Sequence, residues 1–92
     1  MWTVLESGSA RKELDRAPQE IQEKFEAWRS IVEASGSEGL REVKGLHDEA
    51  LSGKWAGHRS SRLNLRYRVI YRVERERQTI YVMRVTAHDY RR

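Results

Sequence analysis

The chain has 92 residues, no cysteine, 38% hydrophobic and 35% charged residues, and a formal net charge of +4. This length predicts a single domain over residues 1–92, and the lack of cysteine excludes disulfides and thiolate metal sites. No apolar run approaches the roughly 18 residues of a membrane span, no signal-peptide pattern opens the chain, and the three histidines lack a second ligand at close helical spacing. We therefore expect a cytoplasmic protein without a metal or cofactor.

The first segment predicts a short strand and a short helix. Residues 2–5 are rich in strand-forming side chains. Ser7 and Ser9 are good N-cap candidates for a helix that runs from about Ala10 to Ala17. Pro18 ends that helix and suits the first turn of another one.

The next segment predicts a longer, amphipathic helix. Its apolar residues recur at intervals of four, three and four, which places them on one helical face: Ile21, Phe25, Trp28 and Val32. The glycine- and serine-rich segment 35–39 is expected to end the helix. Two helices joined at one proline predict a helical hairpin.

The second half of the chain predicts strands. Residues 40–53 are less regular and connect the two halves, with a turn at 51–53. Strands are expected over 55–63, 65–73 and 79–85, with a solvated turn at 74–77. The predicted order is β-α-α-β-β-β, an α+β fold in which the helical hairpin packs on a small, mainly antiparallel sheet.

Positive charge is concentrated in the C-terminal part. Residues 54–92 contain eleven lysines and arginines against three acidic residues. This distribution favours an anionic partner, and nucleic acid is the commonest one. A basic surface without function remains the alternative.

Alternation along residues 65–73 indicates which side chains share a face. The odd positions are apolar or aromatic, while the even positions include Arg66, Arg68 and Arg72, so one face packs on the helices and the other presents arginines. An odd-numbered loop near residue 76 would bring Arg84 and His88 to the face of Arg68, and an odd-numbered turn near Asn64 would add Arg62. An even-numbered loop would separate them.

Three sequence segments resemble a known family. They are Gly53-Lys54-Trp55, Tyr67-Arg68-Val69-Ile70-Tyr71 and Val85-Thr86-Ala87-His88-Asp89-Tyr90. With the order of elements, they are similar to the RelE/ParE toxin superfamily, and more specifically to the RelE/StbE and YoeB-like branch of type II toxin–antitoxin modules. The resemblance covers nearly all of the chain.

The resemblance implies a function and two partners. It implies a ribosome-associated, metal-independent endoribonuclease that cleaves mRNA in the 30S A site and thereby inhibits translation, and that a cognate antitoxin holds inactive. Arg68 matches a phosphate-binding catalytic position, His88 a C-terminal catalytic position, and Tyr90 an aromatic residue that stacks on a base. The predicted strand over 55–63 matches a strand that contributes basic catalytic residues in the family. We expect the basic residues on and around it to bind RNA: Lys54, Arg59, Arg62 and Arg66.

The chemistry suits these residue types. Histidine titrates near neutrality, so His88 is the preferred proton carrier, whereas the guanidinium groups of Arg68 and Arg84 stabilise charge on the phosphate, and Tyr90 grips an exposed base. Ser60 and Ser61 stand where some members of the family have lysine, so the general base is not identified.

Alternatives remain at the residue level and for the whole protein. His88 could be an exposed tail residue, and Arg68 could simply pair with Glu74 or Glu76. The protein could instead be a ParE-like, non-enzymatic inhibitor of DNA gyrase, or an RNA-binding module without catalysis.

Overall fold

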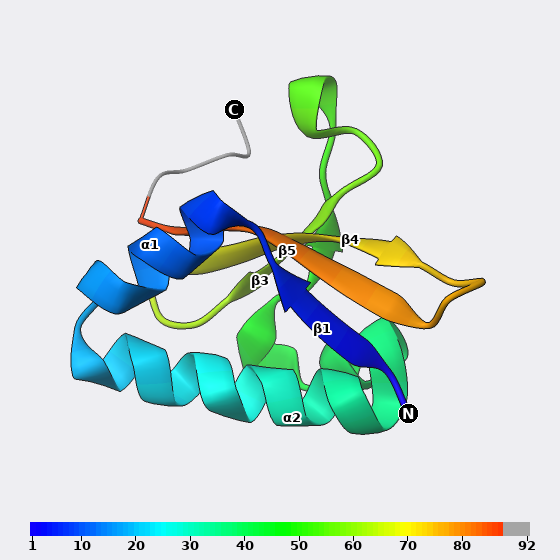
Figure 1. The fold of residues 1–92 in the computed structure, drawn as a ribbon, viewed down its shortest axis with the longest axis horizontal. Coiled ribbons are helices and arrows are strands. Elements are labelled where there is room, and N and C mark those ends of the chain that lie inside the picture. Colours follow the sequence, from blue (N-terminus) through cyan, green and yellow to red (C-terminus); the bar gives the residue numbers. More distant parts are fainter. Residues whose placement is uncertain (88–92) are drawn as a thin grey trace.

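The order of elements confirms the predicted α+β fold and adds one short strand. A computed structural model describes residues 1–87 (Figure 1). The elements in chain order are β1 (Thr3–Glu6), α1 (Gly8–Arg16), α2 (Gln19–Arg41), the 3-10 turn η1 (Lys44–Leu46), β2 (Glu49–Ala50), the 3-10 turn η2 (Gly53–Trp55), β3 (Arg59–Arg62), β4 (Arg68–Glu74) and β5 (Thr79–Thr86). The added strand is β2, whose two residues are too few to give an alternating pattern.

One mixed sheet organises the molecule. Its strand order is β1-β5-β4-β3-β2, with β3, β4 and β5 antiparallel to one another and β1 parallel to β5. The helix α2 lies along one face of the sheet, while α1 lies beside the C-terminal end of β5 (Figure 1). None of the helices within residues 1–87 is long and apolar enough to cross a membrane.

The two helices begin as the sequence predicts. The Ser7 side chain accepts a hydrogen bond of 3.0 Å from the backbone N–H of Ala10 and so caps α1. Pro18 is the N-cap of α2. The end of α2 was predicted too early: Gly36 interrupts the helix with a φ of 67°, but helical structure resumes and continues to Arg41. It resumes because the last turn places Leu40, which is 0% exposed, in the core.

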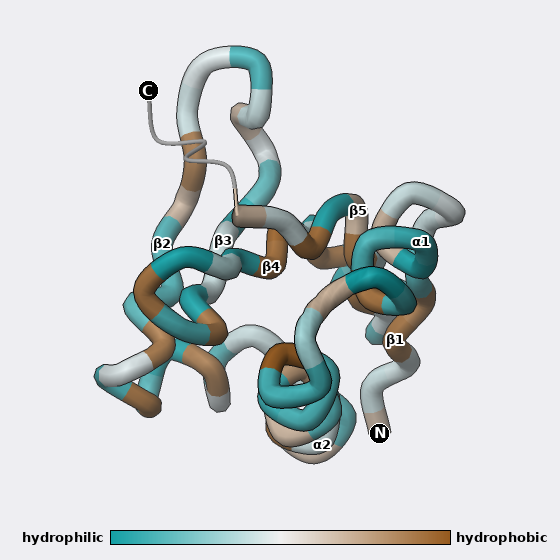
Figure 2. Tube along the Cα trace, turned by 90° about the vertical axis from the view of Figure 1, so that its left-hand side faces the viewer, coloured by the Kyte–Doolittle hydropathy of each residue, from teal (hydrophilic) through white to brown (hydrophobic). Residues whose placement is uncertain are grey.

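The core lies between α2 and the sheet. The predicted apolar stripe of α2 is buried there, with Trp28 stacked on Phe25 at 5.4 Å between ring centroids and in edge contact with Tyr71 of β4, also at 5.4 Å. Figure 2 shows α2 end-on beneath the sheet, with apolar segments of β4 and β5 above it. Burial of this stripe, more than helix propensity, holds α2 in place.

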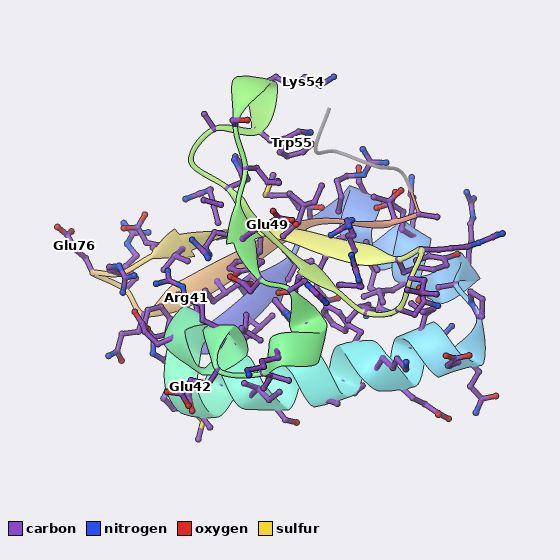
Figure 3. The ribbon with its side chains drawn as sticks, turned by 180° about the vertical axis from the view of Figure 1, so that it is seen from behind. Arg41, Glu42, Glu49, Lys54, Trp55 and Glu76 are labelled. Atoms are coloured by element: carbon purple, nitrogen blue, oxygen red, sulfur yellow. The ribbon has the colours of Figure 1, made fainter. Side chains whose placement is uncertain are left out.

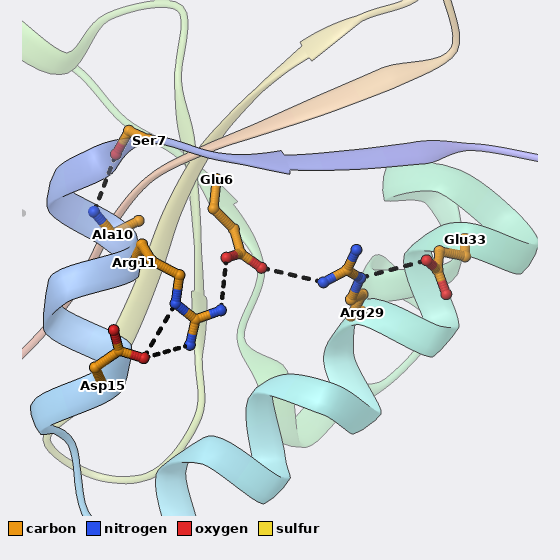
Figure 4. Close-up of polar contacts among 7 residues, drawn as sticks. All are labelled: Glu6, Ser7, Ala10, Arg11, Asp15, Arg29 and Glu33. Atoms are coloured by element: carbon orange, nitrogen blue, oxygen red, sulfur yellow. Dashed lines mark hydrogen bonds and ion pairs between the residues drawn. The ribbon is translucent and has the colours of Figure 1, made fainter.

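A carboxylate at the end of β1 ties the two helices together. Glu6 accepts hydrogen bonds from Arg11 of α1 at 2.9 Å and from Arg29 of α2 at 3.1 Å (Figure 4). Its side chain is 11% exposed, so these charge-assisted bonds are partly shielded from water. They fix the helical hairpin relative to the first strand.

Two predicted strands are shorter than expected. Residues 55–58 lie outside β3, which begins at Arg59. Residues 63–67 form a turn in which the Asn64 side chain accepts from the backbone N–H groups of Arg66 and Tyr67 at 2.8 and 2.7 Å. Leu65 is therefore 89% exposed and does not face the helices as the alternation predicted.

The loop between β4 and β5 has an even number of residues, which was expected to place Arg68 and Arg84 on opposite faces of the sheet. Glu74 pairs with Thr79, so the loop of residues 75–78 is even-numbered. A β-bulge then corrects the register: Tyr71 pairs with Val82 and Ile70 pairs with Arg84, which leaves Met83 as the extra residue. Beyond the bulge, residues of equal parity face each other, as the odd-loop hypothesis required.

Candidate functional site

Two rows of cross-strand neighbours share the sheet face opposite α2. The first row is Arg62, Arg68 and Thr86, and the second is Glu49, Ser60, Ile70 and Arg84. Directly paired residues in adjacent strands point to the same side of a sheet. We call this set of seven residues the arginine face. It brings Arg62, Arg68 and Arg84 together. The sequence predicted this grouping for an odd-numbered β4–β5 loop; the loop is even-numbered, and the bulge at Met83 produces the grouping instead.

The first row places two like charges directly opposite each other. Arg62 of β3 pairs with Arg68 of β4, and Arg68 is only 5% exposed. The Nε of Arg62 and the Oγ of the neighbouring Ser60 are buried and have no hydrogen-bond partner within residues 1–87. Buried polar groups are rarely left unsatisfied, since each costs about 1–3 kcal/mol. Opposed guanidinium groups and unsatisfied donors are the features expected where an anion binds.

The second row ends in an arginine that α1 holds. Glu13 of α1 accepts from the Nε of Arg84 at 3.0 Å and from its Nη2 at 2.7 Å, and it also accepts from the backbone N–H of Val85 at 2.9 Å. This geometry arises because β1 pairs with β5 only as far as Val82, so α1 covers the remaining edge of β5. Glu13 was not singled out from the sequence, since its partner lies 71 residues away.

A projecting segment stands beside the arginine face. Residues 51–58, which we call the arm, rise from the sheet on the side opposite α2 (Figure 1). Figure 3 shows Lys54 at its tip and Trp55 just beneath it. The rings of Trp55 and His58 make an edge contact at 5.0 Å. The predicted RNA-binding residue Lys54 is exposed on the same side of the sheet as Arg62.

Arg59 lies on the other face of the sheet. It pairs with Tyr71, and its Nε donates to Asp48 at 2.7 Å. The Asp48 side chain is 0% exposed and also accepts from the Ser61 Oγ at 2.6 Å and from the Tyr71 hydroxyl at 2.5 Å. We call these four residues the Asp48 cluster.

The Asp48 cluster perturbs the ionisation of its members. Burial, together with the hydrogen bond to Asp48 and its charge, raises the pKa of Tyr71 far above its ordinary value. Burial alone would lower the pKa of Arg59, but its hydrogen bond to Asp48 raises it above the ordinary value. The cluster joins the connecting segment to β3 and β4 at the base of the arm, so Arg59 serves the fold here and does not join the arginine face.

The remaining predicted residues divide between the described segment and the tail. Arg66 is exposed in the turn between β3 and β4. His88 and Tyr90 lie outside the described residues 1–87, so their predicted roles stay predictions. The sequence also did not single out Glu49, a carboxylate that the pairing of β2 with Ser60 brings to the arginine face. Within residues 1–87, no three histidine or acidic side chains gather as metal ligands would.

Comparisons with known proteins give a consistent fold. No protein-family model matches the chain, and no curated protein matches it either. Among solved structures, the YoeB/ParE toxin from Agrobacterium tumefaciens superposes with a TM-score of 0.76 at 20% identity, over 95% of this chain and 99% of that one. YafQ from E. coli strain BL21(DE3) gives 0.77 at 16% identity, over 96% and 94%. RelE in the archaeal RelE–RelB complex from Pyrococcus horikoshii OT3 gives 0.75 at 24% identity, over 94% and 93%.

The chain has the RelE/YoeB toxin fold. The superpositions extend over nearly the whole of each chain. Identities of 16–24% establish the fold and leave the chemistry to be argued from the residues. Within residues 1–87 of this fold, the arginine face brings together predicted functional residues from three strands: β3, β4 and β5.

Proposed function

We propose that this protein is the toxin of a type II toxin–antitoxin module and that it inhibits translation as a metal-independent endoribonuclease acting on ribosome-bound mRNA. The observation that carries the proposal is the Arg62–Arg68 pair, with the unsatisfied Nε of Arg62 and Oγ of Ser60 beside it. A phosphodiester placed there would accept from these donors and relieve the repulsion between the two guanidinium groups.

The arrangement suits cleavage of a phosphodiester by its own 2′-hydroxyl. In that reaction negative charge grows on the phosphate, and fixed donors aimed at it lower the barrier because they are already oriented. Arg68 is held by its burial, so it can act as such a donor without reordering. Arg84 would replace its hydrogen bond to one oxygen of Glu13 with a hydrogen bond to a phosphate oxygen. Its guanidinium group can bind a carboxylate and a phosphate with similar two-point geometry.

Proton transfer is assigned to the tail. His88 is proposed to carry a proton between the 2′-hydroxyl and the leaving 5′-oxygen, and Tyr90 to stack on a neighbouring base. Lys54 in the arm and Arg66 in the turn between β3 and β4 are both exposed, and we propose that they contact the phosphates that flank the cleaved one.

The partners follow from the fold. The RelE of Pyrococcus horikoshii OT3 is found in complex with RelB, and the YoeB of Staphylococcus aureus with YefM. By analogy, a cognate antitoxin is proposed to bind this chain and to hold it inactive, and the 30S A site is proposed as the place where the mRNA is presented.

The test is expression of folded variants in bacteria. Arg68→Ala and His88→Ala should relieve growth inhibition and abolish the cut sites that primer extension maps on transcripts. Arg77→Ala, in the exposed β4–β5 turn, is the matched control and should keep full toxicity. Circular dichroism of each purified protein confirms that the variants remain folded.

Two outcomes would support a different function. Uncut transcripts together with inhibited DNA supercoiling by gyrase would identify a ParE-like inhibitor. Salt-dependent RNA binding without strand scission at any protein concentration would identify a non-catalytic RNA-binding module. Full toxicity of folded Arg68→Ala and His88→Ala proteins would refute the assigned site.

A further inference from the structure

A second basic site lies on the helix side of the sheet, away from the arginine face. It is an open pocket of about 260 Å³ at the outer edge of the sheet, where the end of α2, the base of the arm and the end of β4 meet. Figure 3 shows Arg41 at the end of α2 that borders it. We call it the edge pocket, and its lining includes Arg41, Ala50, Leu51, Arg59, Val73 and Arg75.

The charges around the edge pocket do not cancel. Arg75 donates to Glu38 at 3.0 Å, and Arg59 donates to Asp48. Among the described residues, Arg41 makes no hydrogen bond or ion pair through its side chain. The hydrogen bond from Arg75 holds the pKa of Glu38 below its usual value, and the charges of Arg75 and Arg41 contribute to the same shift. Three guanidinium groups thus face two carboxylates, which leaves one positive charge uncompensated.

The floor of the edge pocket is aliphatic. Leu51 is 9% exposed and Val73 is partly buried against the core, and Ala50 completes this part of the lining. A fitting ligand therefore combines one negative charge with a small apolar group. A glutamate or aspartate in a polypeptide that also carries aliphatic side chains has this combination.

We propose that the edge pocket binds an acidic side chain from a partner protein, with Arg41 as its main anchor. The inference rests on the proposed function, since the antitoxin of the module is the expected partner. A nucleic-acid strand fits less well, because the pocket offers one surplus charge where a strand presents a row of phosphates. A segment docked here would also leave the arginine face open, so it would recruit the partner without itself blocking the RNA.

The experiment measures peptide binding to the full ¹⁵N-labelled chain by NMR. The probe is a blocked peptide of alternating glutamate and leucine, and its control is the same peptide with glutamine in place of glutamate. The glutamate peptide should shift the amide signals of Ala50 and Leu51 and the Nε–H signals of Arg41 and Arg75. Arg41→Gln should weaken binding about tenfold, as expected for loss of one charge-assisted contact, whereas Lys12→Gln on exposed α1 should not.

Three results would overturn the inference: equal shifts with the glutamine peptide, unchanged affinity of Arg41→Gln, or shifts confined to the arginine face. A single-stranded 2′-O-methyl RNA added in place of the peptide should leave the Ala50 and Leu51 signals unshifted, and a shift there would assign the pocket to nucleic acid. Transcript cleavage and peptide binding, both measured on the unmodified chain, separate the two proposals. Cleavage without peptide binding refutes only the edge pocket, and peptide binding by a chain that never cleaves RNA refutes only the nuclease.

Discussion

At the scale of single residues, hydrogen-bond satisfaction separates two kinds of basic side chain. Arg59 is matched by buried Asp48, whose carboxylate also accepts from Ser61 and Tyr71. Arg62, by contrast, has a buried Nε that finds no hydrogen-bond partner in the part of the chain that the structure describes. A satisfied buried network stabilises the fold, whereas an unsatisfied donor costs stability until a ligand supplies an acceptor. Burial and partners therefore distinguish these two arginines better than their nearness in the sequence does.

The Asp48 cluster predicts a stability change at alkaline pH. Because burial and Asp48 raise the pKa of Tyr71 above its ordinary value of 10.0, the unfolded chain releases this proton at lower pH than the folded protein does. The stabilisation is therefore fully present below pH 10 and declines as the pH rises beyond it. Tyr71→Phe removes both the bond to Asp48, at a cost of about 1–3 kcal/mol, and this titration. Urea unfolding from pH 8 to pH 11 should show the advantage of the unmodified chain shrinking above pH 10; a constant difference would contradict this account.

At the scale of elements, the bulge in β5 decides which side chains reach the arginine face. Val82 and Val85 both point into the core although they are three residues apart, and Met83 is the extra residue that makes this possible. If Met83 were paired as in a regular strand, strict alternation would place Arg84 in the core and Val85 on the opposite side of the sheet. The bulge thus reconciles an even-numbered hairpin loop with a basic face.

Deletion of Met83 tests this role directly. In the shortened strand the pairs Tyr71–Val82 and Ile70–Arg84 would follow one another directly. Strict alternation would then keep Val85 in the core and Arg84 on the arginine face without a bulge. We therefore expect the deletion variant to keep a cooperative thermal transition, which circular dichroism would follow. Met83→Ala keeps the residue count and should cost about 1 kcal/mol. A deletion variant that lacks a cooperative transition would contradict the assignment of Met83 as the extra residue of the bulge.

The break in α2 gives a second prediction at this scale. Gly36 has a φ of 67°, and a Cβ placed there would lie 2.8 Å from Cε2 of the Trp2 side chain. Gly36→Ala should therefore lower the free energy of unfolding by about 2 kcal/mol. Gly8 in α1 has open space around it, so Gly8→Ala should be neutral or stabilise by up to about 1 kcal/mol. Urea unfolding of both variants checks the pair, and equal losses would contradict the steric argument.

Local patterns account for most of the elements but not for their exact pairing. The apolar stripe of α2, the Ser7 cap and the alternation in β4 depend on neighbours along the chain, so the sequence alone predicts them. The Asp48 cluster and the Glu13–Arg84 pair join residues from distant segments, and no local period reports such contacts. Strand alternation does predict one of these placements: Arg59 and Arg62 are three residues apart, so their side chains point to opposite faces of the same strand.

At the scale of the whole molecule, the excess positive charge is divided between two sides of one sheet. The arginine face and the arm lie opposite α2, whereas the edge pocket lies on the side of α2 (Figures 1 and 3). A net charge of +4 therefore describes two separate basic surfaces. If each has its own ligand, then removing one charge from either surface should affect one ligand only.

The salt dependence of RNA binding tests this division. For single strands, the logarithm of the binding constant falls with the logarithm of salt concentration with a slope of about −0.7 per phosphate contact. Contacts by Arg62, Arg68 and Arg84, together with those proposed for Lys54 and Arg66, therefore predict a slope of about −3.5. Arg62→Gln should reduce its magnitude by about 0.7. Arg41→Gln makes the same charge change on the other side of the sheet and should leave the slope unchanged. The slopes of both variants can be measured by fluorescence anisotropy with a labelled 2′-O-methyl RNA, which lacks the attacking hydroxyl. Equal reductions in the two variants would mean that RNA responds to the total charge of the molecule and not to the arginine face.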